Sequence, residues 1–147
     1  MDINRIAVIG AGLMGAGIAQ IAAQSGYSVN LMDVEQRFLD KGLSTIGKNL
    51  ARMAEKGKMS QADAETVRGR ITATLALSDA VGDADIIIEA VIERMDLKKN
   101  VWTEMEASAK DSAVFASNTS ALSITELASV TKRPERFIGM HFFNPVP

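Results

Sequence analysis

Residues 5–17 read RIAVIGAGLMGAG, an apolar run typical of a β-strand that passes directly into glycines at positions 10, 12 and 15. In this spacing Gly10 allows a tight turn from strand to helix, and Gly12 lets a pyrophosphate approach the backbone. Gly15 lets the helix pack close to the strand, and the helix N-terminus offers free N–H groups to phosphates. Because a strand precedes the glycines and a helix follows them, the stretch predicts a dinucleotide-binding turn.

An acidic residue, Asp33, closes the next strand-like run, residues 27–32. A carboxylate at that position accepts hydrogen bonds from the adenosine ribose hydroxyls and repels a 2′-phosphate. The first arginine after it, Arg37, is four residues away, so the pattern favours NAD over NADP as the cofactor. The alternative is that Asp33 only caps a turn at the end of the strand.

Apolar periodicity predicts further elements along the chain. Strands are expected at 4–9, 27–32, 71–75, 85–91, 113–116 and 136–142, and helices at 13–25, 35–70, 96–109 and 123–130. Strands that alternate with helices indicate a parallel α/β sheet. We therefore predict a single domain over residues 1–147, with a Rossmann-type, doubly wound, mostly parallel sheet.

Two details refine this prediction. The helical stretch 35–70 is interrupted at Gly57-Lys58, and Ser60 is placed to cap a second helix. A β-α-β connection needs only one helix, so the pair is an insertion that we expect to project from the sheet edge. In the first helix, Leu13 is expected on the face that packs inward.

The composition excludes several classes of protein. The 147 residues contain no cysteine and carry a net charge of −2, with 47% apolar residues. A disulfide framework and thiol chemistry are excluded, and a nucleic-acid or membrane partner is not expected. No apolar run approaches the ~20 residues of a membrane span. The start of the chain does not resemble a signal peptide, which favours the cytoplasm; no metal site is indicated.

His141 is the only histidine, near the end of the predicted strand 136–142. Ligands of open α/β sheets bind at the carboxyl ends of the strands. Imidazole changes charge near neutral pH, so it can take a proton from an alcohol while hydride leaves the same carbon. A structural role for this histidine is the alternative at this point.

Polar residues also follow the two preceding strands. Ser117-Asn118-Thr119-Ser120 can bind a substrate oxygen and the nicotinamide ribose, or can cap the next helix, although Ser123 suits the cap well. Glu93 is expected to face the nicotinamide ribose. Lys98 is expected to meet Glu93 or a phosphate, or else to lie in solvent. Arg52 and Lys56, on the inserted helices, either bind an anionic part of the substrate or are ordinary surface charges.

These segments together resemble the NAD-binding, N-terminal domain of the 3-hydroxyacyl-CoA dehydrogenase family. The resemblance rests on GAGLMGAGIA at 10–19, EAVIE at 89–93, ASNTS at 116–120 and GMHFFNPVP at 139–147. The last two stretches are more specific than the glycine motif, because dehydrogenases in general lack them.

The resemblance implies that (S)-3-hydroxyacyl-CoA and 3-oxoacyl-CoA are interconverted, with His141 as the general base. Ser120 would bind the substrate's 3-oxygen and the nicotinamide end of the cofactor. The positions implied to contact NAD are Gly10, Gly12, Leu13, Met14, Gly15, Asp33, Glu93, Lys98, Asn118, Ser120 and Asn144. The inserted helices touch coenzyme A in the family, which makes Arg52 and Lys56 candidates for the acyl-CoA substrate.

The family also has a glutamate that orients the histidine and a helical second domain that completes the pocket and forms a homodimer. Both would lie beyond Pro147, so we expect this chain to be part of a larger protein, and by itself to bind NAD with little turnover. Three alternatives remain: a related dehydrogenase of a free hydroxy or sugar acid, a non-catalytic NAD-binding module, or a domain of a multifunctional β-oxidation protein. The start at Met1 is taken to disfavour the last.

Overall fold

A computed structural model describes all 147 residues. The strands are β1 (Arg5–Ile9), β2 (Ser28–Met32), β3 (Ile71–Thr74), β4 (Ile86–Glu89), β5 (Val114–Ser117) and β6 (Phe137–Gly139). The helices are α1 (Leu13–Gln24), α2 (Gln36–Glu55), α3 (Gln61–Gly69), α4 (Leu77–Val81), α5 (Met95–Ser108) and α6 (Ile124–Ala128), with a 3-10 turn at Pro134–Arg136. Each strand is followed by a helical connection or, after β6, by the end of the chain.

The six strands form one sheet in the order β3-β2-β1-β4-β5-β6, and every neighbouring pair is parallel. The order reverses between β1 and β4, where Ile9 lies beside Glu89. Open α/β sheets bind ligands outside the carboxyl ends of the strands at such a reversal. The predicted Rossmann-type, doubly wound fold is confirmed, and the sheet is parallel throughout.

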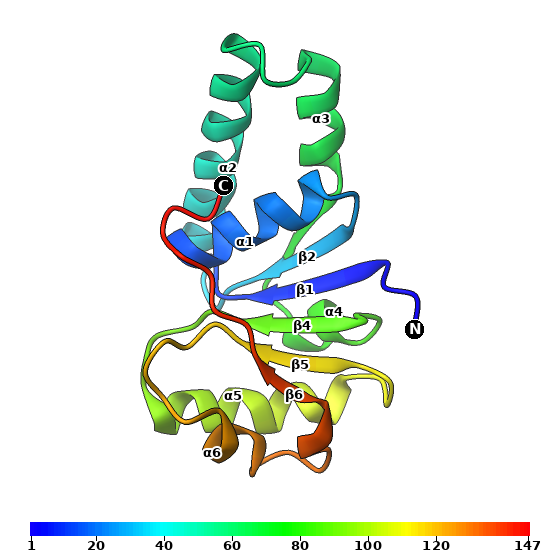
Figure 1. Cartoon of the computed structure of the whole chain (residues 1–147), viewed down its shortest axis with the longest axis vertical. Helices are drawn as coiled ribbons and strands as arrows, with labels where there is room; N and C mark the ends of the chain where they lie inside the picture. Colours follow the sequence, from blue (N-terminus) through cyan, green and yellow to red (C-terminus); the bar gives the residue numbers. More distant parts are fainter.

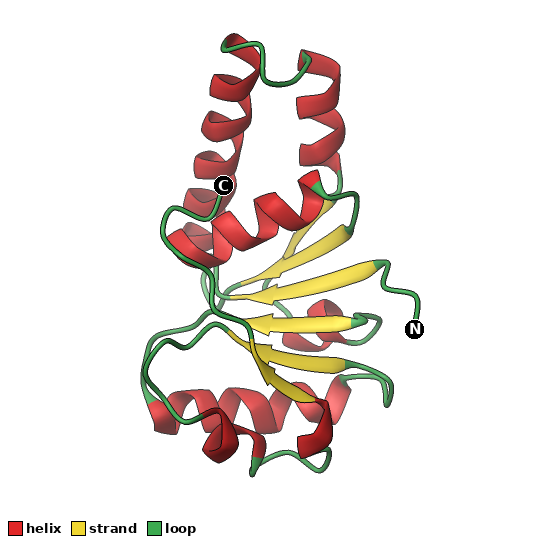
Figure 2. Ribbon diagram, viewed as in Figure 1, coloured by secondary structure: helices red, strands yellow, loops and turns green.

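Side chains of β1 alternate between two hydrophobic cores, one on each face of the sheet. Ile6 and Val8 pack with residues of α1, α2 and α3. Ala7 and Ile9 pack with residues of α4, α5 and α6. Burial on both faces explains why the strand is an unbroken apolar run. In Figure 2 the arrowheads of the strands point to one edge, and the loops that leave them gather there.

The inserted helix pair has the predicted form. α2 ends at Glu55, Gly57 adopts a positive φ of 70°, and the hydroxyl of Ser60 caps α3 by accepting the Asp63 N–H at 3.0 Å. Figure 1 shows α2 and α3 extending together from the sheet, at the opposite end of the molecule from α5 and α6. Although α2 has 20 residues, no helix of the chain is long and apolar enough to cross a membrane.

Some local features differ from the sequence prediction. The last strand stops at Gly139 instead of reaching Phe142, because its partner β5 ends at Ser117 and offers no further backbone to pair with. The five residues of α4 are too few for an apolar period to appear in the sequence. Leu13 is 66% exposed instead of packing inward, since the first residue of α1 lies at the open carboxyl edge of the sheet.

Candidate functional site

The glycine loop joins β1 to α1 at the reversal of strand order. Gly10 has a φ of 105°, and a Cβ there would lie 2.6 Å from the carbonyl oxygen of Ala90, just after β4. A Cβ on Gly15 would lie 1.7 Å from the carbonyl oxygen of Gly10, so α1 needs glycine to approach this closely. A Cβ on Gly12 would have nothing within 4 Å. The fold itself therefore does not require glycine at position 12. The absence of a side chain there leaves open surface at the N-terminus of α1, where a phosphate fits.

Asp33 follows β2 and faces the glycine loop. Its Oδ2 accepts the Ala11 N–H at 2.7 Å, and its Oδ1 accepts the Val34 N–H at 2.7 Å. Each carboxylate oxygen has a second lone pair, and the residue remains partly exposed. Asp33 thus fixes the glycine loop, caps its own turn and still has acceptor capacity for a ribose hydroxyl.

A buried ion pair lies behind the loops at the carboxyl ends of β4 and β5. Glu89 is fully buried, and Lys98 on α5 is 1% exposed. Lys98 Nζ lies 2.5 Å from Glu89 Oε2 and donates to the Val91 carbonyl oxygen at 3.3 Å. Ser117 Oγ donates to the other oxygen of Glu89 at 2.7 Å. Of the alternatives for Lys98, a position in solvent is therefore wrong, because its ammonium group pairs with the buried carboxylate that ends β4. The alternative that Lys98 meets Glu93 is confirmed, with 3.4 Å between Lys98 Nζ and Glu93 Oε1.

Glu93 connects this ion pair to the surface. Its Oε1 accepts the Thr119 hydroxyl at 2.6 Å and lies 3.4 Å from Lys98 Nζ, and its side chain is 43% exposed. Burial raises the pKa of Glu93, but the Thr119 hydrogen bond, the charge of Lys98 and the Ser120 N–H together lower that pKa below its usual value. Glu93 is consequently an ionised, partly exposed acceptor at neutral pH, suited to a hydroxyl group.

The polar residues at the end of β5 and in the turn after it differ in burial. Ser117 and Thr119 are buried, Asn118 is half-buried and Ser120 is exposed. Ser123 caps α6 with its own side chain, so the preceding turn is not used as a cap. Ser120 is therefore the hydroxyl of this turn that is available to a ligand.

His141 lies in the loop after β6 and is exposed. Its ring contacts Phe143, with 5.0 Å between the ring centroids. Because β5 and β6 are parallel neighbours, the loops that carry Ser120 and His141 leave the sheet at the same edge. The two loops are also joined directly, since Asn118 Oδ1 accepts the Phe142 N–H at 2.8 Å.

The C-terminal segment, residues 140–147, runs across the carboxyl edge from β6 to α1 (Figure 1). Phe142 and Val146 pack against the core on the α1 face. A Cβ on Gly17 would lie 2.9 Å from Val146 Cβ, so this glycine makes room for the segment on α1. Asn144 is exposed along the crossing. The segment thus places the histidine loop and the glycine loop at the same edge of the sheet.

The same edge carries exposed apolar side chains. Leu13, Val34 and Ile92, which follow β1, β2 and β4, are 66%, 73% and 71% exposed. Apolar surface beside a few polar groups is typical of sites for organic ligands. These three kinds of surface fit a dinucleotide. The open backbone at Gly12 suits its phosphates, the carboxylate of Asp33 suits a ribose, and the apolar side chains suit its flat rings.

Two of the candidate residues lie elsewhere. Arg52 is in the last turn of α2 and Lys56 directly follows the helix, and both are exposed. The turn between α2 and α3 is far from the sheet (Figure 1). The structure therefore does not bring these two cations together with His141 and Ser120.

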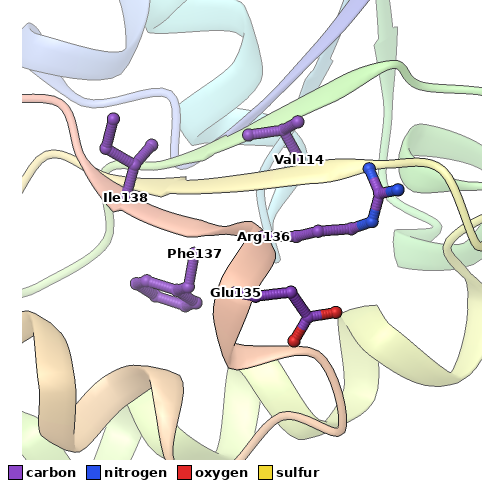
Figure 3. Close-up of a pocket in the computed structure, with 5 residues that line it drawn as sticks. All are labelled: Val114, Glu135, Arg136, Phe137 and Ile138. Atoms are coloured by element: carbon purple, nitrogen blue, oxygen red, sulfur yellow. The ribbon is translucent and has the colours of Figure 1, made fainter.

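A surface hollow of about 490 Å³ lies beside β6 (Figure 3). Its lining residues are Val114, Glu135, Arg136, Phe137 and Ile138. Val114 begins β5 and Phe137 begins β6, so the hollow is at the amino ends of these strands. It does not include any of the candidate site residues, and the carboxyl edge remains the candidate site.

The sequence profile of a family described as "3-hydroxyacyl-CoA dehydrogenase, NAD binding domain" matches residues 5–147. The matched region includes the glycine loop, the buried ion pair and the histidine loop. This chain belongs to the 3-hydroxyacyl-CoA dehydrogenase family. Its cofactor is NAD, as the glycine loop and Asp33 predict.

Individual relatives agree with this assignment. The chain is 48% identical over 143 residues to a probable 3-hydroxybutyryl-CoA dehydrogenase of Deinococcus radiodurans, covering 97% of this chain and 51% of the relative. It is 48% identical over 145 residues to a fatty acid oxidation complex subunit alpha of Psychrobacter, covering 99% of this chain and 20% of the relative. A crystal structure of (S)-3-hydroxybutyryl-CoA dehydrogenase from Ralstonia eutropha superposes with a TM-score of 0.96 at 41% identity, covering 99% of this chain and 51% of that one.

The chain thus spans about half the length of the dehydrogenases it matches and a fifth of the fatty acid oxidation complex subunit. The identity is the same for both kinds of relative, so it does not favour a separate enzyme over a domain of a larger protein.

Sequence reasoning missed three contacts of this site. It left Glu89 without a role, although a carboxylate at the end of a run of three isoleucines signals a buried partner. It assigned Asn118 to the cofactor, whereas the structure shows its side-chain oxygen bound to the Phe142 N–H. The role of Gly17 beneath Val146 had no signal in the sequence, because it depends on where the C-terminal segment crosses α1.

Proposed function

We propose that this chain supplies the NAD site and the general base of an enzyme that interconverts (S)-3-hydroxyacyl-CoA and 3-oxoacyl-CoA. The observation that carries the proposal is the common exit of the Ser120 loop and the His141 loop at the carboxyl edge. These loops leave the adjacent parallel strands β5 and β6, which lie on the β4 side of the reversal of strand order. The names of the relatives support a CoA-linked 3-hydroxy substrate.

In the proposed oxidation, a ring nitrogen of His141 takes the proton of the 3-hydroxyl group as the C3–H bond breaks. The electrons of the O–H bond form the carbonyl π bond, and the proton remains on the imidazole. Bound NAD supplies the acceptor for the hydride. The Ser120 hydroxyl hydrogen-bonds the 3-oxygen and holds C3 in place. The reverse reaction returns the proton from His141 to the oxygen.

The remaining candidate residues have binding roles in this proposal. The glycine loop, including Leu13 and Met14, holds the phosphates, and Asp33 accepts from the adenosine ribose. Glu93 accepts from the nicotinamide ribose, while Lys98 acts through Glu93, because its ammonium group is enclosed by protein. Asn144 is exposed on the crossing segment, from which it contacts the nicotinamide end.

Other parts of the proposal concern the whole protein. Arg52 and Lys56 contact the coenzyme A portion, and a helical domain beyond the described residues completes the pocket and forms a homodimer. The cytoplasmic location and the lack of nucleic-acid and membrane partners stay predictions from the sequence. No carboxylate of this chain forms an ion pair with His141. The isolated 147-residue chain should therefore bind NADH but turn over acetoacetyl-CoA far more slowly than its longer relatives.

A His141→Gln variant tests the role of the imidazole. In a chain of the relatives' length that contains this domain, NADH oxidation with acetoacetyl-CoA should fall by about 100-fold or more, because general acid–base catalysis contributes about 10²–10⁴-fold. The affinity for NADH should stay within about threefold, because in this proposal the glycine loop binds the cofactor's phosphates and His141 does not contact them. Loss of NADH affinity would make His141 a structural residue.

The same assay distinguishes the competing substrates. Acetoacetate in place of acetoacetyl-CoA should give little turnover, and comparable rates with both would favour a dehydrogenase of free acids. Binding of NADH without turnover of either compound in the longer protein would favour a non-catalytic module.

A further inference from the structure

Hydrogen bonds join the two loops that carry the proposed catalytic residues. The Met140 N–H donates to the Ser117 carbonyl oxygen at 2.9 Å. The Phe142 N–H donates to Asn118 Oδ1 at 2.8 Å. His141 lies between these two donors, so its backbone is held on one side by Ser117, which ends β5, and on the other by Asn118, which directly follows it.

The second of these bonds extends the sheet with a side chain. In a parallel pair, alternate N–H groups of one strand point toward the same neighbour. The backbone of Asn118, directly after β5, is paired with β4, because its N–H donates to the Glu89 carbonyl oxygen at 2.9 Å. The Asn118 side chain then presents a carbonyl group to Phe142 where the backbone of β5 no longer does.

This geometry makes the residue type specific. The side chain must carry an acceptor at the distance of an amide oxygen, and the backbone of the same residue must remain paired with β4. The Phe142 N–H is partly buried, so loss of its acceptor leaves an unpaired donor, and the loop would shift to find water. A shift of about 1 Å in a reacting group is enough to lower a rate about 100-fold.

We propose that Asn118 is a positioning residue that holds the His141 backbone through the Phe142 N–H, and that it is not primarily a cofactor contact. This inference rests on the proposed function of His141. In this proposal, the amide side chain of Asn118 connects the loop that carries His141 to the loop that carries Ser120.

The test compares Asn118→Leu, which keeps the size and removes the acceptor, with Asn118→Asp, which keeps an acceptor oxygen. Asn100→Leu is the matched control, since Asn100 is exposed on α5. In the 147-residue chain, amide hydrogen exchange is followed by NMR at Phe142 and Met140, and NADH affinity is measured by fluorescence titration. His141 is the only histidine, so one set of imidazole signals reports on its ring.

In Asn118→Leu, exchange at Phe142 should accelerate at least about tenfold while Met140 changes little, because only one hydrogen bond is lost. The imidazole signals should broaden or multiply, and NADH affinity should stay within about threefold. Asn118→Asp should restore the slow exchange and the single set of signals, and Asn100→Leu should match the unaltered chain.

Unchanged exchange at Phe142 in Asn118→Leu would overturn the proposal, as would a tenfold or larger loss of NADH affinity, which would make Asn118 a cofactor contact. If the leucine variant does not fold, Asn118→Ser, whose side chain is too short to reach Phe142, is judged by the same outcomes. Failure of the proposed function looks different: the imidazole signals of the unaltered chain would not respond to NADH at saturation.

Discussion

Lys98 Nζ on α5 lies 2.5 Å from Glu89 Oε2 at the end of β4, and neither side chain is appreciably exposed. The pair is surrounded by hydrogen bonds, from the Ser117 hydroxyl to Glu89 and from Lys98 to the Val91 carbonyl oxygen. These contacts connect a central strand, a helix and two loops of the candidate site. The ion pair therefore fixes the loops on which Glu93 and the polar turn after β5 are built.

Breaking this pair on one side should destabilise the protein strongly. Lys98→Met leaves the Glu89 carboxylate buried without its cation, and such losses cost about 3–5 kcal/mol. Urea unfolding should show this decrease, and Glu89→Gln combined with Lys98→Met should recover a large part of it. Lys99→Met, the next residue along α5, removes a surface ion pair with Glu126 and should cost no more than about 1 kcal/mol. Equal effects at positions 98 and 99 would contradict the role given to the buried pair.

Alanine at two glycines of the loop should separate folding from cofactor binding. A Cβ on Gly12 meets no protein atom within 4 Å, and its φ of −69° suits alanine. Gly12→Ala should keep its unfolding midpoint yet lose NADH affinity by about tenfold or more, because the methyl group occupies the phosphate approach. Gly15→Ala should instead lower stability by about 1–3 kcal/mol or more, since its Cβ would overlap the Gly10 carbonyl oxygen. Calorimetry and NADH titration measure both effects, and unchanged NADH affinity in Gly12→Ala would place the phosphates elsewhere.

Replacement of Asp33 should weaken the preference for NADH over NADPH. Asp33→Ser removes the negative charge and one carboxylate oxygen that holds the Ala11 N–H. A hydrogen bond to a charged group contributes about 1.5–3 kcal/mol, so NADH affinity should fall by about 10–100-fold. NADPH affinity should fall less or rise, because the repulsion of the 2′-phosphate disappears. Parallel fluorescence titrations check this, and an equal loss for both cofactors would restrict Asp33 to its role in the loop.

Asp85 should make folding stability depend on pH in the acid range. The Lys110 side chain and the backbone N–H groups of Asn4 and Arg5 lower the pKa of Asp85 from 3.8 to about 2. A lowered folded-state pKa stabilises the protein above the unfolded value, and that stability is lost as the pH falls from about 4 toward 2. The difference corresponds to about 2 kcal/mol at neutral pH.

The corresponding experiment compares Asp85→Asn with the unaltered chain in denaturant unfolding between pH 7 and pH 3. The variant should be less stable at pH 7, and the gap should narrow toward acid pH. Asp111→Asn, at an exposed carboxylate, is the control and should show no such trend. If the difference in unfolding free energy between Asp85→Asn and the unaltered chain does not change with pH, the loss of stability would come from packing and not from charge.

Local sequence determined the elements and the cofactor motif. The run RIAVI, the glycine spacing and the Ser60 and Ser123 caps depend on neighbours within a few residues, so periodicity and turn chemistry suffice to predict them. The alternation of strands and helices then restricts the topology to a doubly wound parallel sheet, because parallel strands require crossovers. Because parallel strands all end at the same edge of a sheet, the sequence also predicts that the polar residues after these strands lie at one edge.

Only the tertiary structure decided which of those polar residues face each other. Lys98 is buried because the axis of α5 brings its side chain to the Glu89 carboxylate, and nothing within one turn of the helix signals this. Asn118 binds the Phe142 N–H because the pairing of β5 with β6 stops at Ser117 and Gly139, beyond which the Asn118 N–H is paired with β4. Gly17 faces Val146 because the chain crosses α1 there. These contacts join residues that are 9, 24 and 129 positions apart. Their partners are set by the register and packing of the sheet, which a local pattern in the sequence does not contain.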